Sequence, residues 1–118
     1  MCGIYCSISK TCHIRPDPEI EQRLHKRGPD STGTVHVVYP EGLANDEEHS
    51  SHVTLNSTVL SLRGWQTVSQ PFQDLDANYT LCWNGEAWSI GDQPATGNDT
   101  QIVYELLAQA LNSDHPQT

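Results

Sequence analysis

The stretch MCGIYCSI, residues 1–8, decides how this sequence is interpreted. Residues 3–8 alternate loosely between apolar and polar side chains, which predicts a β-strand that starts almost at the N-terminus and fixes Cys2 at a sheet edge. Removal of Met1 would leave Cys2 with a free α-amine beside its thiol. Since the pKa values of a cysteine thiol and an α-amine are about 8.5 and about 8, the amine can accept the thiol proton near neutral pH. An ordinary thiol at position 2 is the alternative reading of these residues.

The length and charge of the chain narrow the possible classes of function. At 118 residues the chain is at most one domain, and a chain of this size can bury a modest core. Fifteen acidic residues against six basic ones give a net charge of −9, which would repel nucleic-acid phosphates and an anionic membrane surface. We therefore expect neither a nucleic acid nor a membrane as a partner.

The cysteines and the N-terminal residues are the features of the sequence that bear on the cellular compartment. The N-terminus lacks the continuous apolar stretch of a secretory signal, and no run approaches the roughly 18 apolar residues of a membrane span. These features predict a cytoplasmic protein in which Cys2, Cys6, Cys12 and Cys82 are free thiols rather than two disulfides. The spacing of the first three cysteines and His13 matches no zinc framework, so we expect no metal and no cofactor.

The first half of the chain combines helix and strand signals. Asp17 followed by Pro18 is a typical helix start, and Gly28 is a plausible end for that helix. Residues 34–38 and 53–62 are rich in β-branched side chains, which predicts two strands joined by a polar loop at 39–51.

The second half begins with a hairpin signal. Two strands, at 79–83 and 87–90, are expected around Asn84-Gly85, the commonest dipeptide of a tight turn. Apolar residues then recur at helical spacing over 99–111, with Asn98 or Asp99 as the cap. Strands flanked by two helices in one unit predict an α+β layered architecture.

Two further segments carry polar groups in informative positions. Residues 27–33, RGPDSTG, contain two glycines, a proline and a charged pair, which indicates a helix stop followed by a turn of defined conformation. Arg63 ends a run typical of a buried strand, where an unpaired guanidinium would be costly unless it held a carboxylate. A side chain that reaches the surface past the strand end is the equally weighted alternative. Asn84-Gly85, taken alone, is a hairpin turn.

In combination, these segments resemble the glutaminase domain of class II glutamine amidotransferases, a family of N-terminal nucleophile hydrolases. The nucleophile position fits Cys2, and the later segments follow in the family's order along most of the chain. The matching patterns are Cys2-Gly3-Ile4, R-G-x-D-x-x-G on Arg27, Gly28, Asp30 and Gly33, Asn84-Gly85-Glu86, and Asn98-Asp99-Thr100. Residues 60–64, Gln70-Pro71, 83–86 and 98–102 resemble the asparagine synthetase-like members of this family.

The resemblance implies a reaction and a set of roles. Cys2 would attack the side-chain amide of glutamine and form a γ-glutamyl thioester that water hydrolyses to glutamate, with release of ammonia. The Asn84 side chain and the Gly85 N–H would form the oxyanion hole. Arg63 would bind the α-carboxylate of the substrate, and Asp99 its α-ammonium group.

The resemblance also implies supporting residues and a fold. Arg27, Gly28, Asp30 and Gly33 would hold the loop beside the nucleophile. The expected fold is an αββα layered sandwich, and residues 1–118 would be a partial glutaminase domain, incomplete at the C-terminal side and without its synthetase domain. We expect glutamine as the ligand, asparagine biosynthesis as the context, and a synthetase domain or partner chain as a possible completion. A catalytically silent truncated module that binds or regulates is the alternative function.

Overall fold

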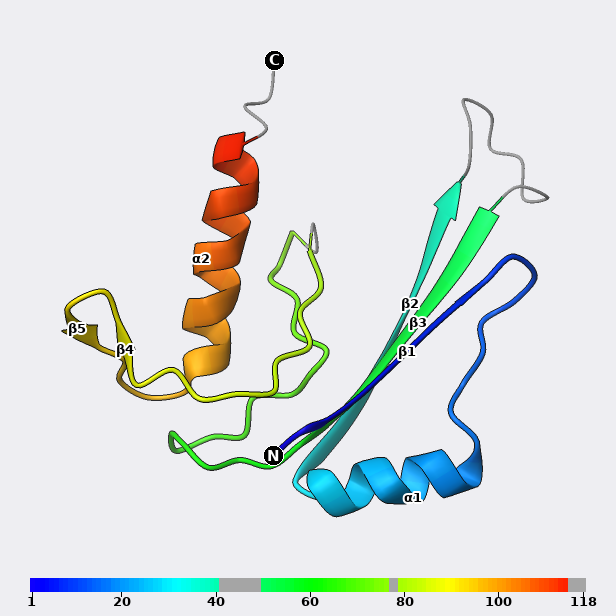
Figure 1. The fold of residues 1–118 in the computed structure, drawn as a ribbon, viewed down its shortest axis with the longest axis horizontal. Helices are drawn as coiled ribbons and strands as arrows, with labels where there is room; N and C mark the ends of the chain where they lie inside the picture. The colour runs from blue at the N-terminus through cyan, green and yellow to red at the C-terminus, as the bar shows by residue number, and fades with distance from the viewer. Residues whose placement is uncertain (41–49, 77–78, 115–118) are drawn as a thin grey trace.

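The computed structural model describes residues 1–40, 50–76 and 79–114, and its main element is a three-stranded antiparallel sheet (Figure 1). In spatial order the strands are β1 (Gly3–Ser9), β3 (Ser50–Val59) and β2 (Ser31–Pro40). The remaining elements are α1 (Pro18–Arg27), the short strands β4 (Ser89–Ile90) and β5 (Gln93–Pro94), and α2 (Asp99–Asp114). This set of elements confirms the predicted α+β class.

Local sequence rules explain helix α1. The Asp17 carboxylate caps the helix by accepting a hydrogen bond from the Ile20 N–H at 2.9 Å, and Pro18 occupies the first helical position. The helix ends at Gly28, whose N–H donates to the Leu24 carbonyl at 3.2 Å. Both predicted ends of this helix are therefore confirmed.

Strand β3 forms the centre of the sheet, and its later residues are almost fully enclosed. Thr54, Ser57 and Thr58 each expose 2% or less of their surface. The Ser57 hydroxyl donates to the Gly3 carbonyl at 3.0 Å, and the Thr58 hydroxyl donates to the Leu24 carbonyl at 2.6 Å. These hydrogen bonds satisfy two buried hydroxyl groups and attach both β1 and α1 to β3.

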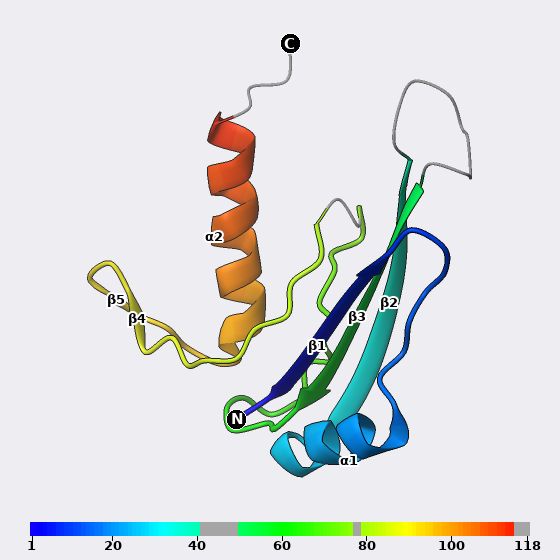
Figure 2. The ribbon, with the colours of Figure 1, turned by 45° about the vertical axis from the view of Figure 1, so that its right-hand side comes forward.

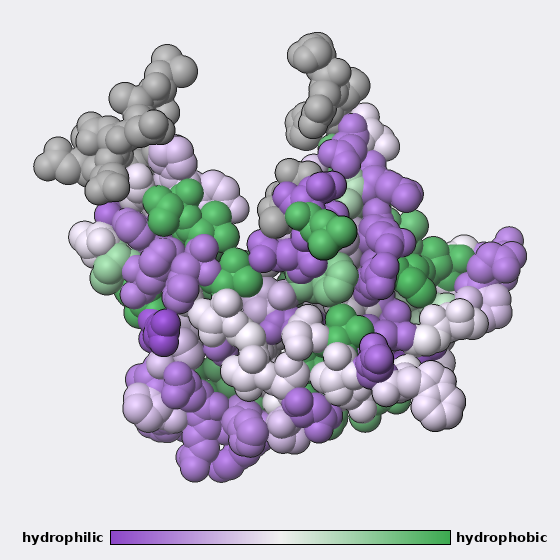
Figure 3. Space-filling view, turned by 180° about the vertical axis from the view of Figure 1, so that it is seen from behind, coloured by the Kyte–Doolittle hydropathy of each residue, from purple (hydrophilic) through white to green (hydrophobic). Residues whose placement is uncertain are grey.

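One face of the sheet is apolar and turns towards α2. Side chains alternate between the faces, so the register that pairs Val37 with Val53 places Leu55 on the same side. With Leu107 and Leu111 of α2, these residues line a hollow of about 470 Å³. Figure 2 shows α2 standing apart from the sheet, and the space-filling view in Figure 3 shows the surface hollowed between these two parts of the molecule.

The opposite face of the sheet is polar and carries a group of histidines. The His13 ring lies 4.4 Å from that of His36 and 5.1 Å from that of His52, measured between centroids. The Thr54 hydroxyl lies 3.2 Å from His36 Nδ1 and 3.3 Å from His13 Nδ1. Desolvation and the neighbouring His36 and His52 lower the pKa of His13 below its ordinary value. Within the described ranges, no group of three or more His, Cys, Asp or Glu is arranged to hold a metal ion.

The strand boundaries differ from the predicted ones. β2 extends through Pro40 and β3 begins at Ser50, so both ends of the loop predicted at 39–51 belong to strands, and residues 41–49 lie outside the described part. β3 ends at Val59 instead of residue 62. Gly33, expected in a loop, lies inside β2.

The hairpin predicted around Asn84-Gly85 is wrong. The segment 79–83 forms only an isolated bridge, in which Leu81 pairs with Phe72. The strand expected at 87–90 is reduced to β4, which pairs with β5 around Gly91-Asp92, where Gly91 has a positive φ of 59°. The backbone N–H groups of Trp83 and Ala87, on either side of the expected turn, donate to side chains elsewhere and do not form a ladder.

The implied αββα sandwich is not confirmed. Across residues 1–40, 50–76 and 79–114 there is one three-stranded sheet and the two-residue pairing of β4 with β5, and a second sheet facing the first is not found. No helix among these residues combines the length and apolar character needed to cross a membrane.

Candidate active site

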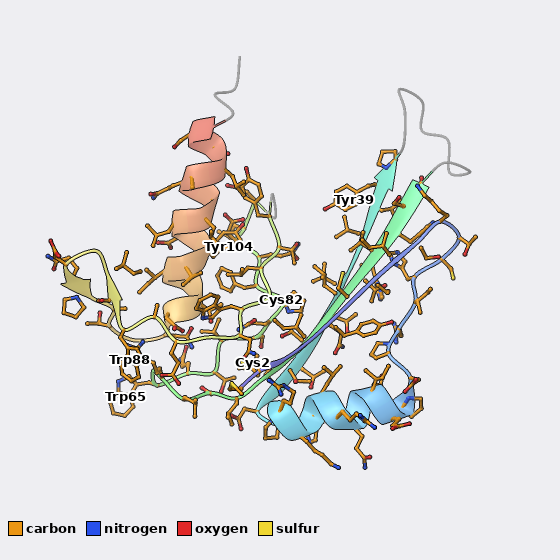
Figure 4. All side chains as sticks on the ribbon, in the orientation of Figure 1. Cys2, Tyr39, Trp65, Cys82, Trp88 and Tyr104 are labelled. Atoms are coloured by element: carbon orange, nitrogen blue, oxygen red, sulfur yellow. The ribbon has the colours of Figure 1, made fainter. Side chains whose placement is uncertain are left out.

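One cavity of about 210 Å³ brings together five residues that the sequence suggests for chemistry. Cys2 comes from the start of β1, Arg63 from the segment after β3, Asn84 and Gly85 from the irregular segment before β4, and Asp99 from the first position of α2. Four separate parts of the chain therefore meet at this point. Figure 4 shows Cys2 where the sheet adjoins the segment from the second half.

Cys2 is held in place through its own backbone and that of Gly3. The Arg27 Nε donates to the Cys2 carbonyl at 3.2 Å, and the Gly3 N–H donates to the Thr58 hydroxyl at 3.2 Å. A Cβ on Gly3 would lie 2.6 Å from the Thr58 Oγ1 and 2.9 Å from a methyl carbon of Leu24. The N-terminal end of β1 is therefore closely packed, which restricts the backbone that carries the Cys2 thiol.

The cysteines differ in their surroundings. Cys2 and Cys82 are partly buried, Cys6 and Cys12 are exposed, and all four are free thiols. Burial, with a smaller effect of the nearby Cys6, raises the pKa of the Cys82 thiol to about 11. Cys82 is therefore a poor nucleophile at neutral pH, whereas Cys2 is the cysteine that lines the cavity.

The segment 27–33 supports the cavity wall from behind. The Asp30 N–H donates to the Val59 carbonyl at 3.0 Å, and its carboxylate accepts a hydrogen bond from the Ser61 N–H at 2.7 Å. A Cβ on Gly28 would lie 2.6 Å from backbone atoms of β3, and one on Gly33 would collide with the Gln70 carbonyl oxygen. Both glycines thus permit close backbone approaches that a side chain would prevent.

Arg63 is partly buried and neighbours a carboxylate. Its side chain is 17% exposed, and the guanidinium donates to the carbonyls of Ala87 and Ala95. The Asp99 carboxylate lies 4.0 Å from Nη1, and the Trp88 ring lies 4.9 Å from Cζ. Two alternatives were open for the Arg63 side chain. The structure favours the one in which the guanidinium pairs with a carboxylate over the one in which it reaches the open surface.

Asp99 is the most enclosed charged residue of the site. Its side chain is 9% exposed, and Oδ2 accepts a hydrogen bond from the Ala87 N–H at 2.6 Å. Asp99 occupies the first turn of α2, where the helix dipole stabilises a negative charge. The cap itself is Asn98, whose side-chain oxygen accepts from the Thr100 N–H at 2.9 Å.

Asn84 and Gly85 both line the cavity and are exposed. Asn84 is exposed, and its side-chain amide makes no hydrogen bond to another described residue. A Cβ on Gly85 would lie 2.8 Å from the Trp83 ring, so that indole packs directly on the glycine. Sequence analysis assigned no role to Trp83, to Gln70 or to Glu86, yet all three line the cavity.

The sequence was also compared with known proteins. The human protein named asparagine synthetase domain-containing protein 1 is 34% identical over 115 residues, a match that covers 95% of this chain. The cattle and mouse proteins of the same name are 34% and 32% identical over the same coverage. The sequence relatives of the present chain are therefore asparagine synthetase domain-containing proteins.

The match covers nearly all of this chain but only a small part of each relative. It covers 16% of the human asparagine synthetase domain-containing protein 1 and 17% of the mouse protein, so the chain spans about a sixth of the length of these relatives. No family model matches the chain, and no solved structure gives a significant match. The predicted resemblance to asparagine synthetase-like proteins is confirmed, while the assignment to class II amidotransferases stays a prediction.

Proposed function

We propose that this chain is a partial glutaminase domain of the class II amidotransferase type, which hydrolyses glutamine in an asparagine synthetase-like context in the cytoplasm. The observation that supports this function best is the single cavity that collects Cys2, Arg63, Asn84, Gly85 and Asp99 from four segments. A nucleophile, a pair of oxyanion donors and a cation–anion pair are the groups that hydrolysis of a free amino-acid amide requires. The names of the sequence relatives agree with the context.

The proposed reaction begins once Met1 has been removed. The free α-amine of Cys2 takes the thiol proton, and the sulfur attacks the side-chain carbonyl carbon of glutamine. The Asn84 amide and the Gly85 N–H stabilise the resulting oxyanion. The amine returns its proton to the leaving nitrogen, which departs as ammonia, and water then hydrolyses the γ-glutamyl thioester to glutamate and the restored thiol.

Substrate selection would rest on Arg63 and Asp99. The guanidinium of Arg63 donates to two backbone carbonyls and retains further N–H groups for the α-carboxylate of glutamine. Asp99 would receive the α-ammonium group. A glutamine within a peptide has neither free group, so this arrangement selects the free amino acid.

Met1 connects processing of the chain with the site. Met1 itself lines the cavity, and in the unprocessed chain the nitrogen of Cys2 belongs to a peptide bond. Removal of Met1 would therefore both supply the base and enlarge the space beside the thiol.

A second candidate function is a catalytically silent module that binds a partner chain. The uncovered apolar face of the sheet and the exposed Leu107 and Leu111 of α2 favour this alternative. A synthetase domain or a separate chain would be the partner.

Glutamate release from glutamine tests the choice between these functions. The protein is purified with Cys2 confirmed as the N-terminal residue, and a Cys2→Ala variant is prepared identically. Turnover that disappears in the variant supports the glutaminase, and absence of turnover from folded protein favours the silent module. Asparagine and a blocked γ-glutamyl anilide serve as competing substrates, and preference for the blocked compound would contradict the roles of Arg63 and Asp99.

A further inference from the structure

Gln70 is a buried polar residue in the cavity wall to which the proposed reaction assigns no role. It is only 2% exposed and lines the cavity with Asn84 and Gly85. Its backbone carbonyl lies directly against Gly33, so the main chain at this position is closely packed. A glutamine side chain enclosed to this degree normally has hydrogen-bond partners for both ends of its amide.

The orientation of the Gln70 amide is fixed by one strong hydrogen bond. The Trp83 N–H donates to Oε1 at 2.6 Å. Reversal of the amide would place its NH₂ group against another N–H donor, so only the observed orientation is favourable. Consequently Nε2 is the end of the amide that points away from Trp83.

Among the residues that the structure describes, the Nε2 end has no hydrogen-bond partner. No other residue within 1–40, 50–76 and 79–114 accepts a hydrogen bond from it. Nε2 also retains accessible surface, unlike the sealed indole nitrogen of Trp83. Since Gln70 is enclosed everywhere except at the cavity that it lines, its free donor opens into that cavity.

The contacts of Trp83 show where in the cavity this donor lies. The residue that holds Oε1 is Trp83, which directly precedes Asn84 and whose ring packs on Gly85. The Gln70 amide therefore lies at the end of the cavity where those two residues lie. A ligand oxygen at that end would complete the hydrogen bonding of an otherwise unsatisfied donor.

We infer that Gln70 is a further ligand-contacting residue, whose Nε2 donates a hydrogen bond to an oxygen of the bound amino-acid amide. This inference rests on the proposed function, because it takes free glutamine as the ligand. Gln70 then has two roles: Oε1 positions the backbone that leads into Asn84, and Nε2 contacts the ligand.

The experiment titrates L-glutamine into ¹⁵N-labelled Cys2→Ala protein, which cannot turn the ligand over, and follows the side-chain amide resonances by NMR. The Gln70 resonances are assigned by their loss in a Gln70→Glu variant, which keeps an acceptor for Trp83 and replaces the donor by a carboxylate oxygen. Gln66→Glu makes the same charge change at an exposed glutamine and is the matched control.

We expect the Gln70 side-chain resonances to shift on titration. We also expect Gln70→Glu to weaken glutamine binding about tenfold or more, with Gln66→Glu unchanged. Binding detected at other resonances, with those of Gln70 unmoved, would overturn the inference and leave the proposed ligand in place. If Gln70→Glu does not fold, the Gln70 side-chain amide is assigned in the parent protein through its backbone connectivity, and its unmoved or shifted resonances still decide. Absence of any shift at saturating glutamine would overturn the proposed ligand together with this contact.

Discussion

The two halves of this chain are held together in different ways. Residues 1–40 and 50–59 contain a sheet whose strands pair along their full length, with α1 attached by a hydrogen bond from the buried Thr58 hydroxyl. Residues 60–76 and 79–114 consist mainly of irregular segments and α2. Individual hydrogen bonds between side chains and backbone fix these irregular segments, such as those of Arg63, Gln70 and Asp99. The first half supplies Cys2 on a rigid frame, and the second supplies the groups proposed to recognise the ligand.

The two halves depend on each other through a few hydrogen bonds between their segments. The Asp30 carboxylate holds the Ser61 N–H, and the Ser31 and Ser69 hydroxyls lie 3.0 Å apart. These contacts join the frame to the segment that continues into the cavity wall. A change in the frame should therefore affect stability or the nucleophile, while a change in the second half should affect catalysis with little loss of stability.

The largest effect should follow from blocking the N-terminus of the frame. A form with one additional residue before Cys2 should lose about 10²–10⁴-fold in turnover, because the α-amine that acts as the base is then an amide. Thermal unfolding should be unchanged, since the extension lies outside β1. Glutamate release measures the loss, and a Cys6→Ala variant is the control for general thiol effects. Equal turnover in the extended form would disprove the free-amine mechanism.

The second prediction tests the ligand-recognising half. Asn84→Ala should lower kcat by about 10²–10³, because one oxyanion donor is removed. Stability should hardly change, since Asn84 is exposed and makes no hydrogen bond to another described residue. The exposed Gln93→Ala is the control in the same half. A loss confined to KM would assign Asn84 to ground-state binding instead.

The third prediction compares glycines in the two halves. Gly28→Ala should destabilise the fold by about 3 kcal/mol, because its Cβ would meet β3 backbone atoms that cannot move aside. Gly97→Ala should cost only about 1 kcal/mol, since nothing lies near its Cβ and only its positive φ of 75° is unfavourable. Denaturant unfolding measures both values. Equal losses would show that the frame is no more tightly packed than the second half.

The smallest effect concerns the histidines on the polar face of the frame. The pKa of His13 is lowered in the folded state, so the unfolded chain binds more protons and stability should fall as the pH decreases below about 6.5. The groups that face His13 are His36, His52 and the Thr54 hydroxyl. His13→Gln should reduce this pH dependence, and the exposed His25→Gln should not. Unfolding midpoints at about pH 7 and about pH 5 measure the slope.

Sequence reasoning succeeded where structure depends on neighbours in the chain. The cap, the first-turn proline and the terminal glycine of α1 are local signals, and the structure confirms each of them. It failed at Asn84-Gly85, because the adjoining N–H groups bond to Gln70 and Asp99, which are distant in sequence. Turn propensity contains no information about such partners.

At the candidate site, too, local sequence signals were informative and contacts between distant residues were not predicted. Cys2 and Arg63 could be singled out from the residues themselves, but roles for all five residues that meet in the cavity came from a resemblance to a family, since composition and spacing did not place them together. Gln70 and Trp83 received no role, because a buried amide and an indole against a glycine are recognisable only from tertiary contacts. The extension of β3 to residue 62 was wrong because the Asp30 carboxylate binds the Ser61 N–H just beyond the strand.

The placement of the three tryptophans has a practical consequence for spectroscopy. Trp65 is fully exposed and Trp88 lies over the guanidinium of Arg63 (Figure 4). The Trp83 ring packs on Gly85 in the cavity wall. Two of the three fluorophores therefore border the site, while the third emits from water. Intrinsic fluorescence with Trp65 replaced by Phe would then report occupancy of the cavity without any attached label.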